Sequence, residues 1–440
     1  MSRAGRAGTL WTIATAACLF AACDGSYDLP ADVRWQSAHF DYLTRTGDSQ
    51  ICPDVLGPLE EHFAQLQDYL GFEWPPGAKV TYEKMLDAND LKQHGNCPLD
   101  RGACAPESMV IASEGMHLHE LVHAYLWPTG FPPTVLVEGA AVALSCGSSE
   151  FPDKPAHTWD QLAGLGYVSP TSTDVYDAGA WLVGYLLTQY DPRLFTTLYQ
   201  RVPTGADADT MDAVFREVYG QSLATIWAAA LAETKPHQVC LWQCSRPPVP
   251  LDGTPVATDG VCGTLDTFHS LTVASTSVVG VSSAGALVGL GSCDQTSLDT
   301  TQHAPGALNL YDLPPGSYFV ASSGDAGTMT LEGPLPSVLA PTCAEATDLA
   351  PFAGFNGFTL TGPDSSDQWF LPLPPPPAGT SHLGSFAGDA SLKVCGSCDP
   401  ASCVGQLQFD AWTWAAGQTV SVAVDPFPPG DSYTVSLFWY

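Results

Sequence analysis

The residue composition changes sharply after Cys244, and this change constrains the fold more than any other feature. Only two glutamates, Glu332 and Glu345, follow that cysteine, while Ser, Thr, Val, Gly and Pro dominate. Short runs of alternating apolar and polar residues lie between Gly- and Pro-rich turns, a pattern typical of strands. These runs are residues 271–278, 317–321, 328–331, 419–424 and 432–439. We therefore predict two all-β, sandwich-like modules, at residues 245–335 and 336–440.

The part before Cys244 is predicted to be α+β. Leu59, Phe63, Leu66 and Leu70 recur at helical spacing and are followed by Gly71, which predicts a helix that ends there. Further helices are expected at residues 135–145, 175–190, 194–201, 209–219 and 222–233, and strands at 79–85 and 109–113. The pattern predicts no regular element in the polar stretches 24–53 and 87–104.

A predicted helix at about residues 115–127 carries the sequence HLHELVHAYLW, in which His119, Glu120 and His123 form H-E-x-x-H. Residues four apart lie on one face of a helix. His119 and His123 can therefore bind one metal ion, with Glu120 beside them as general base. The alternatives are an amphipathic helix that carries these residues by chance, and a metal-binding helix that no longer catalyses.

A catalytic zinc ion needs a third protein ligand and one open position for water. The downstream candidates are Glu138, Glu150, Asp153, His157 and Asp160. Glu138 is the best of them, because a helix–turn–helix of fifteen residues brings it back to His123. Its alternative role is that of a carboxylate placed favourably near a helix N-terminus.

The first 22 residues are predicted to be an export signal. Arg3 and Arg6 precede an apolar run that is too short to span a membrane in the mature protein. The run ends in LFAAC, residues 19–23, which resembles the site at which bacterial lipoproteins are cleaved and lipidated. The resemblance implies a lipid on Cys23 and a place in the bacterial cell envelope outside the cytoplasm; the alternative is plain secretion.

Charge and cysteine content agree with export. The chain has 15 Lys and Arg against 46 Asp and Glu, a formal charge of −31, which argues against nucleic acid as a partner. Of 14 cysteines, Cys18 lies in the signal and Cys23 would carry lipid, which leaves 14 − 2 = 12. In an exported protein these are expected to form disulfides. One possible pairing is Cys97 with Cys104 and Cys52 with Cys146.

Four segments together resemble one group of enzymes: HELVHAYL, LVEGAAV, YDAGAWLVGYL and DAVFREVYGQSLATIW, within residues 117–233. They are similar to the gluzincin clan of zinc peptidases, and most similar to the bacterial "peptidase MA-like" proteins. The resemblance implies a zincin-like metallopeptidase domain at residues 23–244, with His119, His123 and Glu138 as zinc ligands and Glu120 as base. It also implies that residues 109–113 form a sheet edge along which an extended substrate pairs.

Two further features come from that resemblance. Similar proteins carry a tyrosine at the position of Tyr176, which makes it the candidate donor to the oxyanion; its alternative role is packing. The neighbouring Asp177 either orients a ligand histidine or caps the helix. The thermolysin branch has an acidic residue where this chain has Val142, so another residue must orient the histidine ring.

Residues 313–320, LPPGSYFV, resemble a strand of bacterial pre-peptidase C-terminal sandwiches.

The resulting hypothesis is an exported, lipid-anchored zinc metallopeptidase that acts on proteins or peptides. The alternative of a different class is a cell-surface binding or structural lipoprotein with an inactive peptidase-like domain. A zinc hydrolase that acts on a non-protein amide is a third possibility. The sequence leaves open the natural substrate, endo- or exopeptidase action and the oligomeric state.

Overall fold

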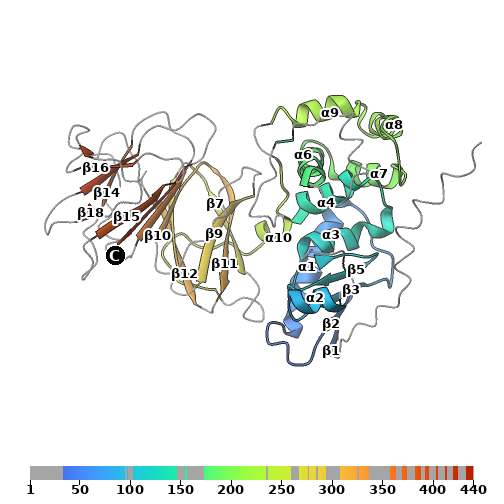
Figure 1. The fold of residues 1–440 in the computed structure, drawn as a ribbon, viewed down its shortest axis with the longest axis horizontal. Coiled ribbons are helices and arrows are strands. Elements are labelled where there is room, and N and C mark those ends of the chain that lie inside the picture. Colours follow the sequence, from blue (N-terminus) through green and yellow to red (C-terminus); the bar gives the residue numbers. More distant parts are fainter. Residues whose placement is uncertain are drawn as a thin grey trace, which may run out of the picture.

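The computed structural model describes residues 33–94, 97, 103–145, 154–155, 173–233 and 236–258, and most of the strands beyond (Figure 1). From residue 357 onward it describes strand backbone alone. The chain is mixed α/β in its N-terminal region and β-rich in its C-terminal part, as predicted. None of the described helices is long and apolar enough to cross a membrane.

The N-terminal sheet has five strands in the order β1-β2-β3-β5-β4. They are β1 (Val33–Gln36), β2 (Phe40–Thr44), β3 (Val80–Lys84), β4 (Ala103–Cys104) and β5 (Met109–Ala112). The three central strands, β2, β3 and β5, are parallel, whereas β1 and β4 run antiparallel to their neighbours. Strands β3 and β5 were predicted, but β1 and β2 lie in the stretch that was predicted to be irregular.

The prediction that residues 109–113 form the sheet edge is wrong. Strand β5 pairs with β3 on one side and with β4 on the other, through Ala112 with Ala103 and Ile111 with Cys104. The edge strand is therefore β4, which lies in the predicted loop 87–104 together with a helix, α2. The predicted disulfide Cys97–Cys104 is confirmed and ties this edge strand to the loop after α2.

Nine described helices belong to the N-terminal region. They are α1 (Leu56–Leu70), α2 (Ala88–His94), α3 (Leu118–Leu126), α4 (Thr134–Ser145), α6 (Thr173–Gln189), α7 (Pro192–Arg201), α8 (Ala208–Tyr219), α9 (Leu223–Ala230) and α10 (Leu241–Cys244), with 3-10 turns η2 (Pro53–Val55) and η3 (Trp127–Thr129). Gly71 ends α1 in the left-handed conformation, at φ 64°. Ser222 caps α9 by accepting a hydrogen bond from the Thr225 amide. These ends follow the sequence signals closely.

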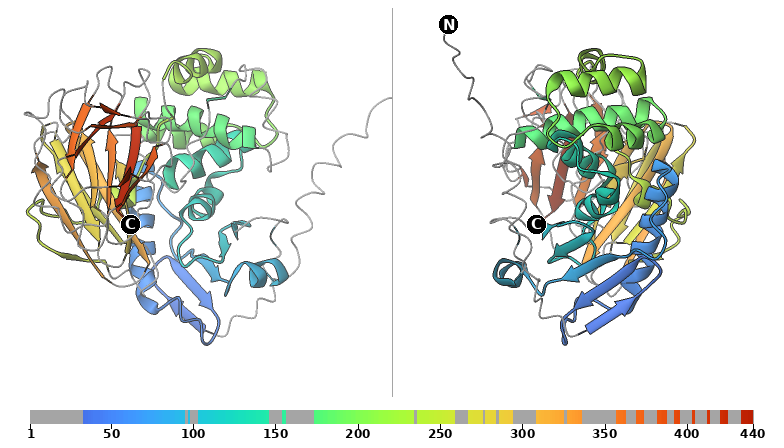
Figure 2. Two further views of the ribbon diagram at one scale, coloured as in Figure 1. Left: turned by 60° about the vertical axis from the view of Figure 1, so that its left-hand side comes forward. Right: turned by 90° about the vertical axis from the view of Figure 1, so that its right-hand side faces the viewer.

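One hydrophobic core joins the sheet and the helices. The buried side of α1, including Leu59, Phe63 and Leu66, contributes to it, and so do Phe40 and Tyr82 from the sheet. Figures 1 and 2 show α3 and α4 between the five-stranded sheet and the layer formed by α6 to α9. Helices α3 and α4 are therefore held from both sides, which makes them a rigid support for side chains.

The C-terminal strands form three sheets, in the orders β18-β15-β20-β13-β10-β8-β12-β6, β7-β11-β9 and β14-β19-β16-β17. Their bounds are β6 (Val256–Ala257), β7 (Thr267–Val273), β8 (Ser277–Ser283), β9 (Ala286–Ser292), β10 (Leu308–Leu313), β11 (Gly316–Gly324), β12 (Thr328–Leu335), β13 (Gly357–Gly362), β14 (Trp369–Leu373), β15 (His382–Ala387), β16 (Leu392–Cys395), β17 (Cys403–Val404), β18 (Trp412–Thr413), β19 (Val420–Val424) and β20 (Tyr433–Trp439).

Side chains of β7, β9 and β11 share one core with those of β8, β10 and β12. The first two sheets thus face each other as in a β-sandwich. Strands from both predicted modules lie in the eight-stranded sheet, because β10 pairs in parallel with β13. The division into two modules stays a prediction.

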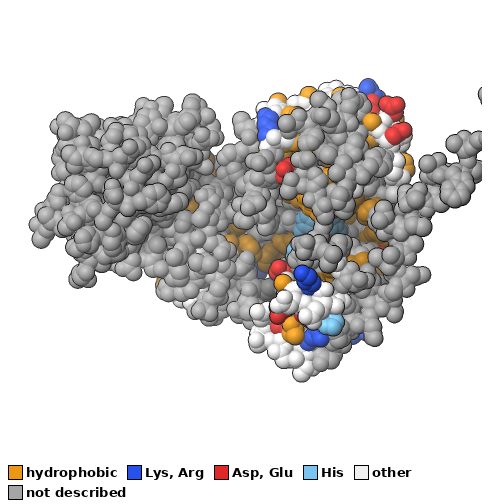
Figure 3. All heavy atoms as spheres, in the orientation of Figure 1, with side chains coloured by type: hydrophobic (Ala, Val, Ile, Leu, Met, Phe, Trp, Pro, Cys, Tyr) orange, Lys and Arg blue, Asp and Glu red, His pale blue; other side chains and the backbone are white. Residues whose placement is uncertain are grey.

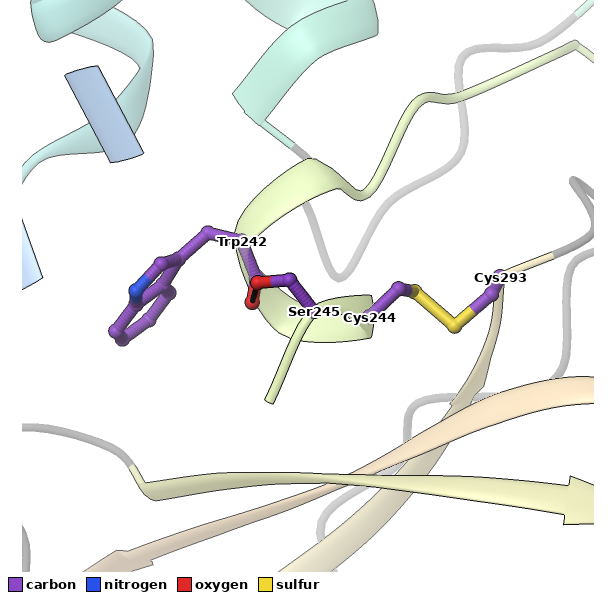
Figure 4. The surroundings of a disulfide bond; sticks show 4 residues. All are labelled: Trp242, Cys244, Ser245 and Cys293. Atoms are coloured by element: carbon purple, nitrogen blue, oxygen red, sulfur yellow. Dashed lines mark hydrogen bonds between the residues drawn. A yellow bond between two sulfur atoms is a disulfide. The ribbon is translucent and has the colours of Figure 1, made fainter. Parts of the chain in front are cut away.

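A disulfide between Cys244 and Cys293 joins α10 to the residue after β9 (Figure 4). Figure 4 shows Trp242 leaving the same short helix in the opposite direction, and its ring packs against Phe268 of β7 at a centroid distance of 4.9 Å. Arg246 forms an ion pair with Glu61 of α1. The β-rich part is therefore fixed to the helical part by a covalent bond, an aromatic contact and an ion pair.

Candidate metal centre

Helix α3 is positioned at its N-terminus by two tyrosines of the central strands. The Tyr82 hydroxyl accepts a hydrogen bond from the His117 amide at 2.8 Å and donates one to the Glu114 carbonyl at 3.0 Å. The Tyr42 hydroxyl donates to the Gly115 carbonyl, also at 3.0 Å. The two rings stack with their centroids 4.9 Å apart and 5° between their planes. The segment that leads into α3 is thus bound directly to the sheet.

His117 is the N-cap of α3. It has an extended backbone, with φ −108° and ψ 94°, and its side chain accepts a hydrogen bond from the Glu120 amide. The sequence contains no Ser, Thr, Asp or Asn at this position, so the usual capping signal is missing. Burial lowers the pKa of His117, which favours the neutral ring that a capping acceptor needs.

Helix α4 brings Glu138 to α3, and α6 supports α4 from behind. Gly139 of α4 and Gly179 of α6 touch backbone to backbone: a Cβ added to Gly139 would lie 2.5 Å from the Gly179 carbonyl oxygen. A Cβ added to Gly179 would lie 2.5 Å from the Val135 carbonyl oxygen. The two helices can cross this closely only because neither residue has a side chain.

His119, His123 and Glu138 converge, as predicted, and form a group that could hold a metal ion. The Nε2 atoms of His119 and His123 lie 3.2 Å apart. Oε2 of Glu138 lies 3.3 Å from the first nitrogen and 3.2 Å from the second. The three atoms thus form a nearly equilateral triangle.

The geometry of this triangle fits a tetrahedral metal ion. Zinc binds histidine nitrogen and carboxylate oxygen at about 2.0–2.1 Å, which separates two ligands of a tetrahedron by about 3.3 Å. The observed separations are 3.2–3.3 Å. Glu138 Oε2 is buried and has no other hydrogen-bond partner among the described residues. A cation at the centre would satisfy this oxygen and both nitrogens at once.

The three side chains differ in burial. The side chain of Glu138 is 8% exposed, whereas those of His119 and His123 are 20% and 14% exposed. Burial opposes the charged form of Glu138, but the hydrogen bonds from the two histidines outweigh it and hold its pKa well below the usual value. Glu138 is therefore ionised, as a metal ligand must be. Figure 3 shows histidine side chains in a hollow on the larger, right-hand lobe.

The ring of Tyr176 lies close to this group, and Glu120 follows His119 directly in the chain. The ring of Tyr176 lies 6.0 Å from that of His119, centroid to centroid, and is tilted by 31°. Tyr176 stands one helical turn before Gly179, so the close crossing of α4 and α6 brings it here. Glu120 is buried, at 7% exposed. The other candidate ligands, Glu150, Asp153, His157 and Asp160, lie outside the described residues.

Sequence reasoning missed the residues that hold the site in place, namely Tyr42, Tyr82 and the capping His117. It also did not assign a role to Gly139 and Gly179. The strand pattern that places Tyr82 on the buried face could have identified it as a core residue, but its bond to residue 117 depends on the fold. No protein-family model matches this chain, and no curated protein sequence matches it.

Proposed function

We propose that this chain is an exported zinc peptidase that hydrolyses peptide bonds with a metal-activated water and Glu120 as general base. The observation that supports it most is the triangle of His119, His123 and Glu138, whose edges match one face of a zinc tetrahedron. Two imidazoles and one carboxylate are a donor set that zinc favours, and three protein ligands leave one position open.

The chain's own residues would share the chemistry as follows. A zinc ion held by the three ligands supplies a Lewis acid, which lowers the pKa of water and polarises a carbonyl. Glu120, next to His119 in the chain, accepts the proton of the attacking water and donates it to the leaving amine. The Tyr176 hydroxyl donates a hydrogen bond to the oxyanion. Glu138 is ionised before the metal binds, because the two histidines hold its pKa low, and a zinc ion would keep it so.

Other parts of the molecule support an exported enzyme. The disulfides Cys97–Cys104 and Cys244–Cys293 belong to an oxidising compartment. Cys52 is also disulfide-bonded, while Cys146, its predicted partner, lies outside the described residues. The resemblance to gluzincins, the zincin-like fold of residues 23–244 and a lipid on Cys23 are parts of the same proposal.

The first experiment is to measure the zinc content of the purified mature protein beside the variants His123→Ala and Glu138→Ala. We expect one zinc per chain in the wild type and a loss in both variants. The matched control is His94→Ala, which removes a histidine that is 45% exposed and should leave the zinc content unchanged. Glu120→Gln should keep the zinc and lower peptide hydrolysis by about 10²–10⁴-fold.

Two outcomes contradict the proposal in different ways. If the wild-type protein takes up no zinc, even when metal is added back, the proposed peptidase function is wrong. The alternative of a cell-surface binding or structural protein is then favoured. If the wild-type protein binds zinc through all three residues but cleaves no peptide, the proposed metal site stands and the proposed peptidase activity is wrong.

A further inference from the structure

The solvent-accessible side of α3 is a narrow stripe. Residues 120–122 and 124–126 are buried, whereas His119 and His123 are partly exposed. Trp127, directly after the helix, is 38% exposed. Among the described residues, only Leu86 and Trp127 are large hydrophobic side chains with such exposure. Trp127, one of these two exposed side chains, therefore lies next to the candidate metal centre.

Trp127 continues the helical face that carries the two histidines. Its amide donates a hydrogen bond to the His123 carbonyl, and its backbone is helical, with φ −49° and ψ −46°. Residues 119, 123 and 127 thus follow one another at intervals of four. At a rise of about 1.5 Å per residue, Trp127 lies about 6 Å along the helix axis from His123.

Phe131 extends this aromatic surface. Its ring lies 5.6 Å from that of Trp127, with 62° between the planes, and its carbonyl accepts a hydrogen bond from the Thr204 hydroxyl at 2.6 Å. The buried prolines 132 and 133 follow it directly. The Trp127–Phe131 pair is thus held in place by α3 on one side and by the bound segment on the other.

We propose that the Trp127–Phe131 pair binds a large apolar side chain of the peptide substrate and so sets the cleavage specificity. This inference rests on the proposed peptidase function. Two residues of an extended peptide span about 6.6 Å, close to the axial distance of about 6 Å between His123 and Trp127. A side chain about two residues from the bond at the metal centre therefore reaches the pair when the peptide runs along α3. Contact with an exposed aromatic surface favours Phe, Tyr, Trp, Leu or Met.

The test begins with digestion of a mixture of proteome-derived peptides by the zinc-loaded wild type, followed by mass spectrometry of the products. We expect large apolar residues to be enriched at one fixed position near the cleaved bond. Two synthetic peptides that differ only at that position, Leu against Ala, then give kcat and KM. Trp127→Ala should lower kcat/KM for the Leu peptide about tenfold, mainly through KM, and change the Ala peptide little.

Two further variants make the result specific. Trp127→Phe keeps an aromatic ring and should retain most of the preference for Leu, whereas Leu86→Ala removes the other exposed apolar side chain and should change nothing. Zinc content is measured in every variant, because a change at Trp127 that unfolds α3 would lose the metal. Zinc-loaded Glu120→Gln should bind the Leu peptide about tenfold more tightly than the Ala peptide, without any turnover.

The failures of the two proposals differ. If the zinc-loaded wild type cleaves no peptide, the proposed function is wrong and the specificity surface is wrong with it. If peptides are cleaved without a preference for large apolar residues, or with a preference that Trp127→Ala leaves intact, the peptidase function stands and this inference is overturned.

Discussion

Gly139 and Gly179 touch directly behind the candidate metal ligand Glu138. The Cα of Gly139 would lie 2.8 Å from a Cβ placed on Gly179, a distance that real side chains do not tolerate. Gly139 follows Glu138 in α4, and Tyr176 stands one turn before Gly179 in α6. One helix crossing therefore sets the positions of the third candidate ligand, Glu138, and of the candidate oxyanion donor, Tyr176, together.

Gly139→Ala should separate α4 from α6 and damage the metal centre. The added Cβ meets backbone atoms, which cannot move aside as a flexible side chain can, so we expect a loss of about 2–3 kcal/mol in the free energy of unfolding. We also expect weaker zinc binding. Gly57→Ala in α1 is the control, since a Cβ there meets nothing within 4 Å. Urea unfolding measures the stability of the two variants, and zinc titration measures their zinc affinity. Equal stability of the two variants would contradict the close contact between α4 and α6 at Gly139.

Tyr82→Phe should weaken zinc binding without removing a ligand. It deprives the His117 amide and the Glu114 carbonyl of their shared partner, which should cost about 1–3 kcal/mol. The segment before α3 is then less well fixed, and zinc affinity should fall about tenfold, as when an outer partner of a ligand is lost. Tyr69→Phe removes a hydroxyl bond to the Leu187 carbonyl in α6 and should leave zinc affinity unchanged. Competition with a zinc chelator measures both variants.

Local patterns predicted much of the fold. The ends of α1, α8 and α9 follow Gly71, Gly220 and Ser222, because helix capping depends on a few neighbouring residues. The convergence of the candidate metal ligands was predictable for a similar reason: His119 and His123 are four residues apart on one helix. Glu138 needed only the added assumption of a short turn between two helices.

The parts that were missed depend on contacts between distant segments. Strands β1 and β2 lie at the start of the domain, and a run with charged Arg34 and Asp41 does not look like a strand until its partner is known. The position of β4 outside β5 depends on a two-residue pairing. The Gly139–Gly179 contact joins two helices whose close approach no single-helix pattern reveals.

Removal of the Cys244–Cys293 disulfide should loosen the β-rich part from the helical part. The bond closes a loop of 49 residues, for which chain entropy gives about 4 kcal/mol, against about 2.5 kcal/mol for the seven-residue separation of Cys97 and Cys104. We expect the variant with both Cys244→Ser and Cys293→Ser to melt in two separate transitions. The variant without Cys97–Cys104 should keep one main transition at a lower temperature. Calorimetry distinguishes the two variants. Similar melting curves for both would contradict the prediction that the Cys244–Cys293 disulfide joins the β-rich part to the helical part.

Glu83 should make the protein less stable as pH rises. Its side chain lies beside Ile111 of β5 in the sheet register, and burial raises its pKa to about 7, with Asp90 adding to the rise and Arg45 opposing it. Between pH 4.5 and 7 the folded chain keeps a proton on Glu83 that the unfolded chain has lost, so the contribution of Glu83 to the free energy of unfolding falls as pH rises across this window.

Glu83→Gln should remove this fall and stabilise the protein at pH 8 by on the order of 2 kcal/mol, with little change at pH 4. Glu73→Gln, at an exposed position, is the matched control and should change neither value. Urea unfolding at the two pH values decides the matter, because equal shifts at pH 4 and pH 8 would show that the effect of Glu83→Gln does not come from titration.

His62 should have the opposite dependence and destabilise the protein in acid. It is fully buried in α1, and neither ring nitrogen has a hydrogen-bond partner among the described residues. Burial lowers its pKa to about 3, so between pH 6.5 and 3 the unfolded chain binds a proton that the folded chain does not. The contribution of His62 to the free energy of unfolding therefore falls as pH falls through this window, by about 2 kcal/mol between pH 6.5 and 5. Glu83 contributes with the opposite sign over the same interval.

His62→Leu should remove this acid loss, because leucine fills a similar volume and has no polar atom to desolvate. His94→Leu, at a side chain that is 45% exposed, should retain the loss. Both variants are unfolded with urea in the presence of a chelator, so that protonation of His119 and His123 cannot contribute through lost zinc. If His62→Leu loses as much stability as the wild type between pH 6.5 and 5, another group is responsible for the acid sensitivity. If the loss disappears in His62→Leu, His62 causes the acid sensitivity, and its effect opposes that of Glu83 between pH 4.5 and 6.5, where the two titration windows overlap.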